Sequence, residues 1–255
     1  MDFLISANTD VGIKKDTNQD GLSVKVIGTP TGKIVFAILC DGMGGLAKGE
    51  VASTSVISAF NNWLSDKLPD LCRKGINDAD VRKQWENILL TQNENIQAYG
   101  EKNGIKLGTT AVIMLLTNDR YYIMNIGDSR AYEIFDTVHQ ITEDQTFIHR
   151  EIKMGRMTPE EAKIDPRRNV LLQCIGASED IYPDMFFGDT KKNAVYMLCS
   201  DGFRHLITED EIYQKFQPSA LVDTNAMDKN SKELIELNKQ RKENDNISVL
   251  LVRTY

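Results

Sequence analysis

The segment AILCDGMGGLAKGE, residues 37–50, carries an apolar run into an aspartate and then into a backbone rich in glycine. The run IVFAILC, residues 34–40, is apolar throughout, which is typical of a strand buried on both faces. Asp41 therefore stands at the tip of a buried strand. Gly42, which follows it, lets other atoms approach the main chain closely. The sequence thus places a carboxylate where backbone oxygen atoms are also accessible.

Four other aspartates stand at the ends of predicted strands. Asp128 follows YYIMNIG, and Asp201 follows VYMLCS. Asp20 precedes GLSVKVI, and Asp245 precedes NISVLLV. One aspartate at a strand end is an ordinary turn residue, but five in similar positions, four of them next to a glycine, indicate a common site. Gathered carboxylates repel one another and resist burial, so they stay ionised together only around strong positive charge.

Oxygen ligands of this kind favour Mg²⁺ or Mn²⁺ over zinc. The chain has only three histidines, and its four cysteines lie far apart, so neither a zinc site nor a disulfide is expected. Two ions about 3.5–4 Å apart can share a carboxylate and lower the pKa of a water molecule, which suits an attack on phosphorus. Asp41 would then bridge two ions, helped by the carbonyl of Gly42.

The composition excludes several functional classes. With 255 residues, 41% hydrophobic and 26% charged, the chain resembles a soluble globular protein. Its net charge of −7 leaves no basic stripe for nucleic acid. No stretch approaches the roughly 20 apolar residues of a membrane span, and the N-terminus lacks the features of a secretory signal. We therefore expect a cytoplasmic protein that neither spans a membrane nor binds nucleic acid.

The periodicity of apolar residues predicts a single α+β domain over residues 1–255, with antiparallel strands and helices that cover them. Strands are expected at 3–7, 21–27, 34–40, 109–116, 121–130, 131–135, 138–142, 170–176, 185–190, 195–202 and 246–252. Helices are expected at 52–63, 81–99, 209–216 and about 230–242, with a polar connection over 69–80. Thr158 with Glu161, and Thr208 with Glu211, have the spacing of capping boxes.

The motifs TDVGIKKDTNQD, CDGMGGLAKGEVAS, GTTAVIMLL, NIGDSRAY, ITEDQT, CSDG and ENDNISVLLV, in this order, resemble the metal-dependent protein phosphatase family (PPM, the 2C-type Ser/Thr phosphatases). The resemblance spans essentially the whole chain and is strongest to the bacterial members. It implies a central β-sandwich of two antiparallel sheets, with a pair of helices on each outer face (α/β/β/α) and a flap at about residues 143–190. The implied activity is hydrolysis of phosphoserine and phosphothreonine in proteins by a metal-activated water, without a phosphoenzyme.

The resemblance also implies roles for the aspartates. Asp41, Asp201 and Asp245 would hold the first ion, and Asp41 with the Gly42 carbonyl would hold the second. Asp20 would act through a water or as an outer carboxylate beside Gln19. Asp128 would serve a third, weaker ion that it shares with Asp201.

Two positions depart from the family pattern. Lys15 stands where the family usually has an arginine that clamps the substrate phosphate, and lysine supplies the charge without the bidentate geometry. Lys15 would therefore bind phosphate less tightly, unless it simply lies in solvent. Met43 stands where many animal members have a histidine proposed as the general acid, so a water, or no acid at all, would serve here.

The flap and one histidine leave two interpretations open. The basic residues of the flap would contact phosphorylated or acidic substrates, or would only make a solvated surface; they are Arg150, Lys153, Arg156, Lys163, Arg167 and Arg168. His205 follows Asp201 by four residues, so it lies either near the site or half-exposed at the junction of a loop and a helix.

Three alternatives to a protein phosphatase remain. A pseudophosphatase that only binds partner proteins would have lost a metal carboxylate, and none is lost here. A two-metal hydrolase of small phosphate esters fits the same residues. A structural β-sandwich whose aspartates cap turns requires many coincidences of spacing. The phosphatase interpretation implies phosphoprotein substrates and a cognate Ser/Thr protein kinase as partner.

Overall fold

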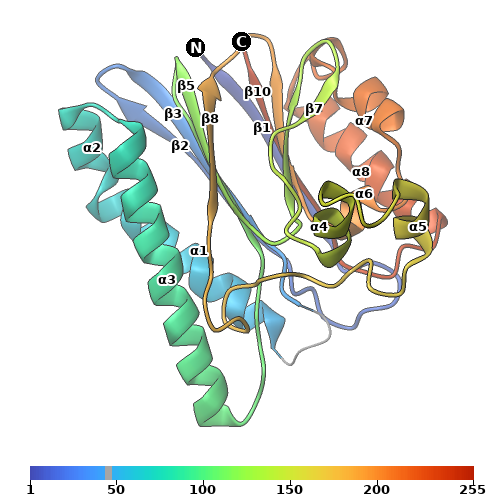
Figure 1. Cartoon of the computed structure of the whole chain (residues 1–255). Coiled ribbons are helices and arrows are strands. Elements are labelled where there is room, and N and C mark those ends of the chain that lie inside the picture. Colours follow the sequence, from blue (N-terminus) through green and yellow to red (C-terminus); the bar gives the residue numbers. More distant parts are fainter. Residues whose placement is uncertain (44–47) are drawn as a thin grey trace.

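Two five-stranded antiparallel sheets lie face to face in the computed structural model, which describes residues 1–43 and 48–255 (Figure 1). The first sheet has the order β1 (Phe3–Asp10), β10 (Ile247–Thr254), β9 (Val195–Cys199), β6 (Arg130–Ile134) and β7 (Val138–Gln140). The second has the order β2 (Gly21–Thr29), β3 (Gly32–Cys40), β4 (Ala111–Leu116), β5 (Arg120–Ile126) and β8 (Asp184–Asp189).

Strand β3 is buried on both faces, as its uninterrupted apolar run predicts. Its residues Val35, Ala37 and Leu39 belong to the cluster between the two sheets. Phe36 and Ile38, which alternate with them, belong to the cluster beneath the outer helices. Successive side chains of a strand point to opposite faces, so this one segment connects two layers of the core.

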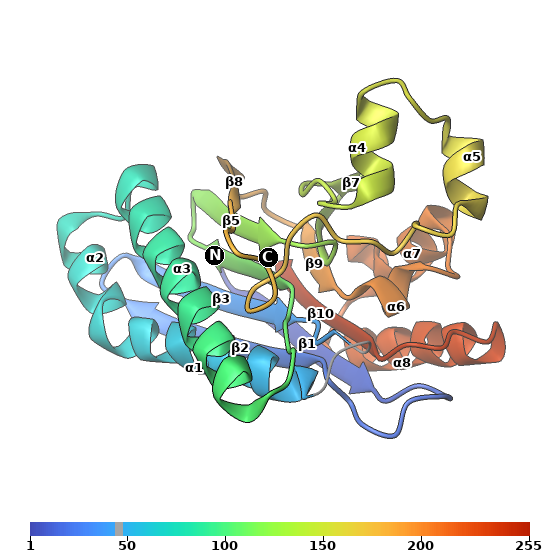
Figure 2. The ribbon, with the colours of Figure 1, turned by 60° about the horizontal axis from the view of Figure 1, so that its bottom comes forward.

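Helices cover both outer faces, which confirms the predicted four-layer sandwich (Figure 2). The second sheet is covered by α1 (Gly49–Asp66), α2 (Leu68–Lys74) and α3 (Asp78–Asn103). The first is covered by α6 (Asp201–Arg204), α7 (Glu209–Phe216) and α8 (Thr224–Gln240), with a 3₁₀ turn at Pro218–Ala220. The capping box of Thr208 and Glu211 forms at the start of α7.

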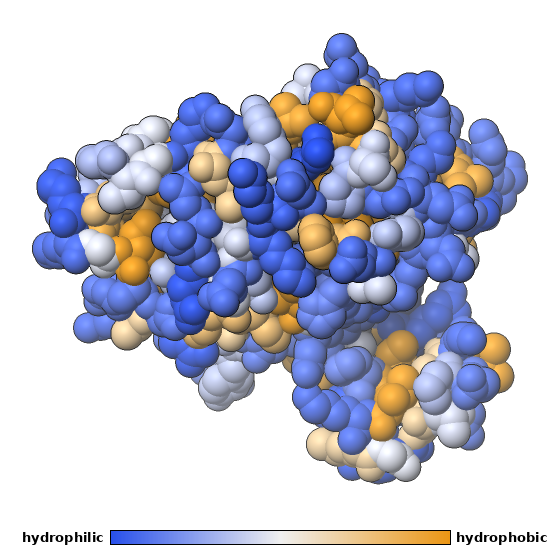
Figure 3. All heavy atoms as spheres, turned by 90° about the horizontal axis from the view of Figure 1, so that it is seen from above, coloured by the Kyte–Doolittle hydropathy of each residue, from blue (hydrophilic) through white to orange (hydrophobic). Residues whose placement is uncertain are grey.

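The flap leaves the sandwich after β7 and returns to it at β8. It carries the helices α4 (Phe147–Lys153) and α5 (Pro159–Ile164), and the capping box of Thr158 and Glu161 opens α5. Its base is fixed by backbone hydrogen bonds, from the N–H of Leu172 to the carbonyl of Gln145 and from the N–H of Gln145 to that of Gly127. Seen from above, these helices form a lobe at the lower right, with a hollow between the lobe and the sandwich (Figure 3).

Several predicted boundaries are wrong. The expected strands 121–130 and 195–202 end at Ile126 and Cys199, because a turn follows the first and helix α6 follows the second. Residues 170–176 do not form a strand: Leu171 and Ile175 make single bridges, to Thr146 and Thr109, because this segment passes between the flap base and the sandwich. The connection over 69–80 contains helix α2, whose Leu68 and Leu71 are buried. Helix α8 begins at Thr224 rather than near residue 230, because the side chain of Asp223 caps the N–H of Ala226.

The two ends of the chain lie side by side, on the terminal residues of neighbouring strands β1 and β10 (Figure 1). The N–H of Asp2 donates to the carbonyl of Tyr255, and the N–H of Tyr255 donates to that of Asp2, both at 3.0 Å. Among the helices of the described residues, none combines the length and the apolar character needed to cross a membrane.

Candidate active site

The five strand-end aspartates converge on Asp41. Burial raises the pKa of Asp41 well above its ordinary value, and repulsion from the other four carboxylates raises it further. Those four are Asp20, Asp201, Asp128 and Asp245. They come from both sheets, since Asp41 follows β3 of the second sheet whereas Asp245 precedes β10 of the first. The fold thus brings the strand-end aspartates near Asp41, and their role as ligands of metal ions stays a prediction.

Two threonines hold the backbone of Asp41. The N–H of Asp41 donates to Thr110 Oγ1 at 3.0 Å, and its carbonyl accepts from the N–H of Thr110 at 2.9 Å. Thr109 Oγ1 donates to the same carbonyl, and the Thr110 hydroxyl lies 2.7 Å from that of Ser129. Because the main chain is fixed on both sides, only the side chain of Asp41 remains free to turn.

Gly42 lies where no side chain fits. A Cβ atom at this position would be 2.5 Å from the carbonyl oxygen of Gln19 and 2.7 Å from that of Gly49. The N–H of Gly42 also donates to the carbonyl of Gln19 at 3.2 Å. This close approach brings the loop that carries Asp20 against the end of β3. The motif residues Gly44 and Gly45 lie outside the described residues.

Asp20 has one satisfied oxygen atom and one unsatisfied one. Its Oδ2 accepts a hydrogen bond of 2.6 Å from the hydroxyl of Ser248 in β10, whereas its Oδ1 is buried and has no hydrogen-bond partner among the described residues. Burial, followed by repulsion from Asp201 and Asp245, raises the pKa of Asp20 to about 7 against the effect of Ser248. Such an oxygen is free to accept a cation or a bound water.

Asp201 and Asp245 are brought together by a glycine. A Cβ atom on Gly202 would lie 2.2 Å from the carbonyl oxygen of Asn246, so only glycine lets α6 pack against the start of β10. The Oδ1 atom of Asp201 is buried and accepts no hydrogen bond from the described residues. Asp245 pairs with Lys15, whose Nζ lies 3.1 Å from Asp245 Oδ1. Lys15 therefore lies at the carboxylate cluster and not in open solvent.

His205 lies between two carboxylates of the site. Its Nε2 is 3.5 Å from Asp201 Oδ2, and its Nδ1 is 3.5 Å from Glu243 Oε2. Burial alone would lower the pKa of His205, but the hydrogen bond with Glu243 and the charge of Asp201 outweigh burial and raise it. His205 fits both interpretations from the sequence: it lies near Asp201, and it is an exposed residue at the C-terminal end of α6, where a loop follows.

Arg204 places a fixed positive charge at Asp128. Its Nη2 lies 3.0 Å from the carbonyl oxygen and 3.3 Å from the Oδ2 of Asp128, and 3.5 Å from Asp144 Oδ2. Arg130 holds Asp144 through two hydrogen bonds. Burial raises the pKa of Asp128 to about 7, with repulsion from Asp201 added and the Arg204 charge opposing it. The guanidinium of Arg204 therefore already occupies one side of Asp128, the predicted ligand of a third ion.

The donor set fits divalent ions in its chemistry. It consists of carboxylates and main-chain carbonyls, and two buried carboxylate oxygens, on Asp20 and Asp201, have no partner among the described residues. No three acidic, histidine or cysteine side chains of the described residues are already grouped around one point. Asp20 Oδ2 contacts Ser248, and Asp245 contacts Lys15. Coordination of an ion by these carboxylates would therefore require their side chains to turn, whereas the main chain of Asp41 is fixed by Thr109 and Thr110.

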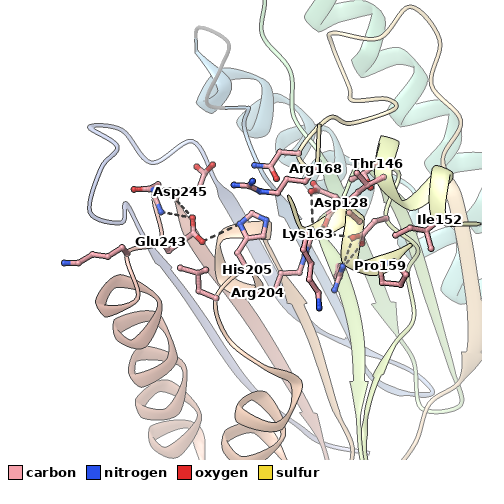
Figure 4. Close-up of a pocket in the computed structure, with 18 residues that line it drawn as sticks. Asp128, Thr146, Ile152, Pro159, Lys163, Arg168, Arg204, His205, Glu243 and Asp245 are labelled. Carbon is pink, nitrogen blue, oxygen red and sulfur yellow. Dashed lines mark hydrogen bonds and ion pairs between the residues drawn. The ribbon is translucent and has the colours of Figure 1, made fainter. Parts of the chain in front are cut away.

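A cavity of about 590 Å³ opens between this cluster and the flap. Asp128, Asp245 and His205 line it on the side of the sandwich, and Ile152 and Lys163 line it from the flap. Figure 4 shows Glu243 and Asp245 on one side of the cavity and Thr146, Ile152 and Pro159 on the other. The cavity is continuous with the carboxylates, so a phosphorylated side chain at the cluster would leave room for neighbouring residues.

Sequence reasoning missed four residues of the site: Thr110, Arg204, Glu243 and Ser248. Thr110 lies in the quoted motif GTTAVIMLL, and Arg204 is the second residue after CSDG. The sequence therefore pointed to their positions but not to their roles. Glu243 and Ser248 flank Asp245, and an acidic or hydroxyl residue next to a predicted ligand was the available sign.

Comparisons with known proteins agree with this geometry. A family model described as protein phosphatase 2C matches residues 13–238. The protein phosphatase PhpP of Streptococcus pneumoniae is 30% identical over 211 residues, which cover 82% of each chain. The chain also resembles the solved serine/threonine phosphatase of S. agalactiae, with a TM-score of 0.82, 26% identity and coverage of 99% of this chain and 100% of that one.

A further similar structure is the catalytic domain of the serine/threonine protein phosphatase PstP, which was solved in complex with two manganese ions. It has a TM-score of 0.78 and 26% identity, and the match covers 98% of this chain and 97% of that one. The metal-containing relative therefore shares the fold over nearly its whole length.

The raised pKa of Asp20 predicts how stability depends on pH without metal. The native pKa of about 7 lies above the ordinary value of 3.8, so native Asp20 retains its proton and this contribution to stability is lost as pH rises through 7. Asp20→Asn removes that loss. The measurement is urea denaturation in a buffer that contains a chelator. The unfolding free energy of Asp20→Asn minus that of the wild type is expected to increase by roughly 2 kcal/mol between pH 5 and pH 7.

The matched control for this measurement is Asp66→Asn, at an exposed position at the end of α1. Its difference from the wild type should not change over the same pH range. A pH-independent difference for Asp20→Asn would show that Asp20 is not held in a repulsive environment.

Proposed function

Because this chain belongs to the protein phosphatase 2C family, we propose that it hydrolyses phosphoserine and phosphothreonine monoesters in proteins with the help of two divalent metal ions. The observation that carries the proposal is the placement of four other aspartates around Asp41, with a buried unsatisfied oxygen on Asp20 and on Asp201. The ions are Mg²⁺ or Mn²⁺, the whole chain acts as one catalytic domain, and the site of action is the cytoplasm.

The residues of the chain divide the work of holding the ions. Asp41, Asp201 and Asp245 would hold the first ion, and Asp41 with the carbonyl of Gly42 would hold the second. Asp20 contributes through a water molecule or as an outer carboxylate. When bound, the ions would neutralise charge on the phosphate and would lower the pKa of a water molecule for attack on phosphorus. The hydrogen bonds of Thr109 and Thr110 to the main chain of Asp41 support this assignment, because a carboxylate that serves two ions needs a fixed position.

Lys15 binds the phosphate group of the substrate in this proposal. Its ammonium lies 3.1 Å from Asp245, and a bound ion would neutralise that carboxylate and free the lysine for phosphate. A lysine offers a single charge without the planar fork of arginine. Met43 carries no proton to donate, so the proton for the departing serine or threonine oxygen comes from water.

The same geometry argues that a third ion at Asp128 is weak. Such an ion, shared with Asp201, would have to displace the Arg204 guanidinium from Asp128 Oδ2, 3.3 Å away. The side chain of Arg204 is only 12% exposed and is also held by Asp144. It therefore cannot move far into solvent.

The substrates we propose are phosphorylated proteins, and the partner we propose is the Ser/Thr protein kinase whose products this enzyme removes. A binding module without activity is disfavoured because every carboxylate of the predicted set is present. A hydrolase of small phosphate esters uses the same machinery, but a metabolite would leave the cavity of about 590 Å³ beside the cluster largely unused.

Asp201→Asn is expected to abolish most of the activity. Both the wild type and the variant are assayed for hydrolysis of a phosphothreonine peptide and of p-nitrophenyl phosphate. Each assay is run with Mn²⁺, with Mg²⁺ and with a chelator. Loss of a residue that only hydrogen-bonds to a metal ligand typically lowers activity roughly 10- to 100-fold. Loss of a direct ligand should lower kcat/KM by more than this. A folded wild type that stays inactive with every metal would instead favour the binding module.

Lys15→Arg is expected to lower KM for the phosphothreonine peptide by roughly threefold to tenfold, because a bidentate fork replaces a point charge. Lys15→Met should raise KM, and kcat should change less than KM in both variants. The measurement is steady-state kinetics at saturating Mn²⁺. Equal KM values for the wild type and both variants would remove Lys15 from the phosphate site.

Arg204→Gln is expected to strengthen a third binding event for Mn²⁺. Removing the guanidinium frees Asp128, and we expect a roughly tenfold lower Kd, equivalent to about 1.4 kcal/mol, by calorimetric titration. Adding Asp128→Asn to this variant should remove the event. If the Kd of the third Mn²⁺ is the same in Arg204→Gln and in the wild type, Arg204 does not compete with an ion.

A further inference from the structure

The basic residues of the flap fall into two groups. Four of the six pair with carboxylates of the same segment: Arg150 and Arg156 with Glu151, Lys153 with Glu143, and Arg167 with Asp165. Lys163 and Arg168 have no carboxylate within ion-pair distance among the described residues, and both line the cavity beside the carboxylate cluster. The two basic residues of this set that have no carboxylate partner therefore both lie at the cavity.

A third cation without a partner, Lys242, lines the same cavity from the side of the sandwich. Lys242 follows the end of α8 and likewise forms no ion pair within the described residues. Its φ is 69°, in the left-handed region where the Cβ of any residue other than glycine is crowded. Glycine is the usual residue at this place after a helix. A lysine kept in a strained position is a sign that its side chain has a function.

The acidic residues that line the cavity are already compensated. Arg204 pairs with Asp128 and Asp144, whereas Glu243 contacts His205. Asp245 pairs with Lys15 and belongs to the proposed ion site. The cations without a partner thus outnumber the anions without one, although the net charge of the whole chain is −7.

The chemistry of the remaining lining matches an extended peptide. Ile148, Ile152 and Leu206 line the cavity together with the three cations. Apolar walls lower the local dielectric constant and strengthen the attraction between a cation and an anion. They also accommodate the aliphatic stems of acidic side chains. A free inorganic anion would not need such walls.

We propose that this cavity binds a second anionic group of the substrate, either acidic side chains or another phosphate, next to the phosphorylated residue at the carboxylate cluster. The inference rests on the proposed function and specifies its substrates: phosphoproteins whose modified serine or threonine stands in an acidic or multiply phosphorylated segment. Lys163, Arg168 and Lys242 determine this preference and do not take part in the chemical step.

The test compares phosphothreonine peptides of equal length. One series carries a cluster of glutamates on either the N-terminal or the C-terminal side, a second carries glutamines there, and a third carries a non-hydrolysable phosphonate side chain. For the wild type with Mn²⁺, kcat/KM for the best anionic peptide should exceed that for the matched glutamine peptide by roughly threefold to tenfold, a range typical of several exposed ion pairs. The larger of the glutamate and phosphonate ratios identifies the natural anion.

The variant Lys163→Gln, Arg168→Gln, Lys242→Gly should reduce that ratio to about one, since these ion pairs supply the preference. Its matched control is Lys83→Gln, Lys102→Gln, two exposed positions on α3 at the far side of the sandwich, which should keep the wild-type ratio. The ratio of the wild type should also fall in about 0.5 M KCl, because salt screens exposed charges. Thermal denaturation verifies that both variants are folded.

The outcomes separate the inference from the function on which it rests. Equal cleavage of anionic and glutamine peptides by an active wild type overturns the inference and leaves the phosphatase function standing. A preference that survives in the triple variant also overturns it. A wild type that cleaves none of the peptides with any metal overturns both.

Discussion

Repulsion among carboxylates is the constraint on which the rest of the site depends. Asp41 sits among four like charges in a buried place, and each of the others is restrained by a different kind of group. Ser248 donates to Asp20, and Lys15 faces Asp245. Arg204 faces Asp128, and His205 faces Asp201. These contacts reduce the repulsion without removing it, and divalent ions bound to the native carboxylates would reduce it further. Metal affinity and protein stability are therefore linked.

The sandwich makes this arrangement possible because backbone packing, and not the side chains themselves, brings the carboxylates together. Gly42 and Gly202 permit contacts that a single added carbon atom would prevent. Thr109 and Thr110 fix the main chain of Asp41 from the neighbouring strand. Contacts within the protein itself thus fix the main chain at the site.

Much of this was predictable from local patterns. The apolar run of β3, the caps at Thr158 and Thr208, and the aspartates at strand ends each carry their information within a few residues. The predicted strand at 170–176 failed because apolar residues under the flap look the same as those of a sheet. Arg204 was missed for another reason. Its contact with Asp128 joins residues that are 76 positions apart, and no local pattern in the sequence predicts such a contact.

The pairing of the chain ends has a consequence for the engineering of this molecule. Strand β10 runs eight residues from the metal-binding end of the sandwich to the paired termini, a distance of roughly 25 Å. A short linker would join Tyr255 to Met1 without moving a strand, and new ends could open at the exposed turn of Pro30 and Thr31. The order of the strands along the chain is thus separable from their positions in space. A circularly permuted chain would present the same carboxylates to the same ions.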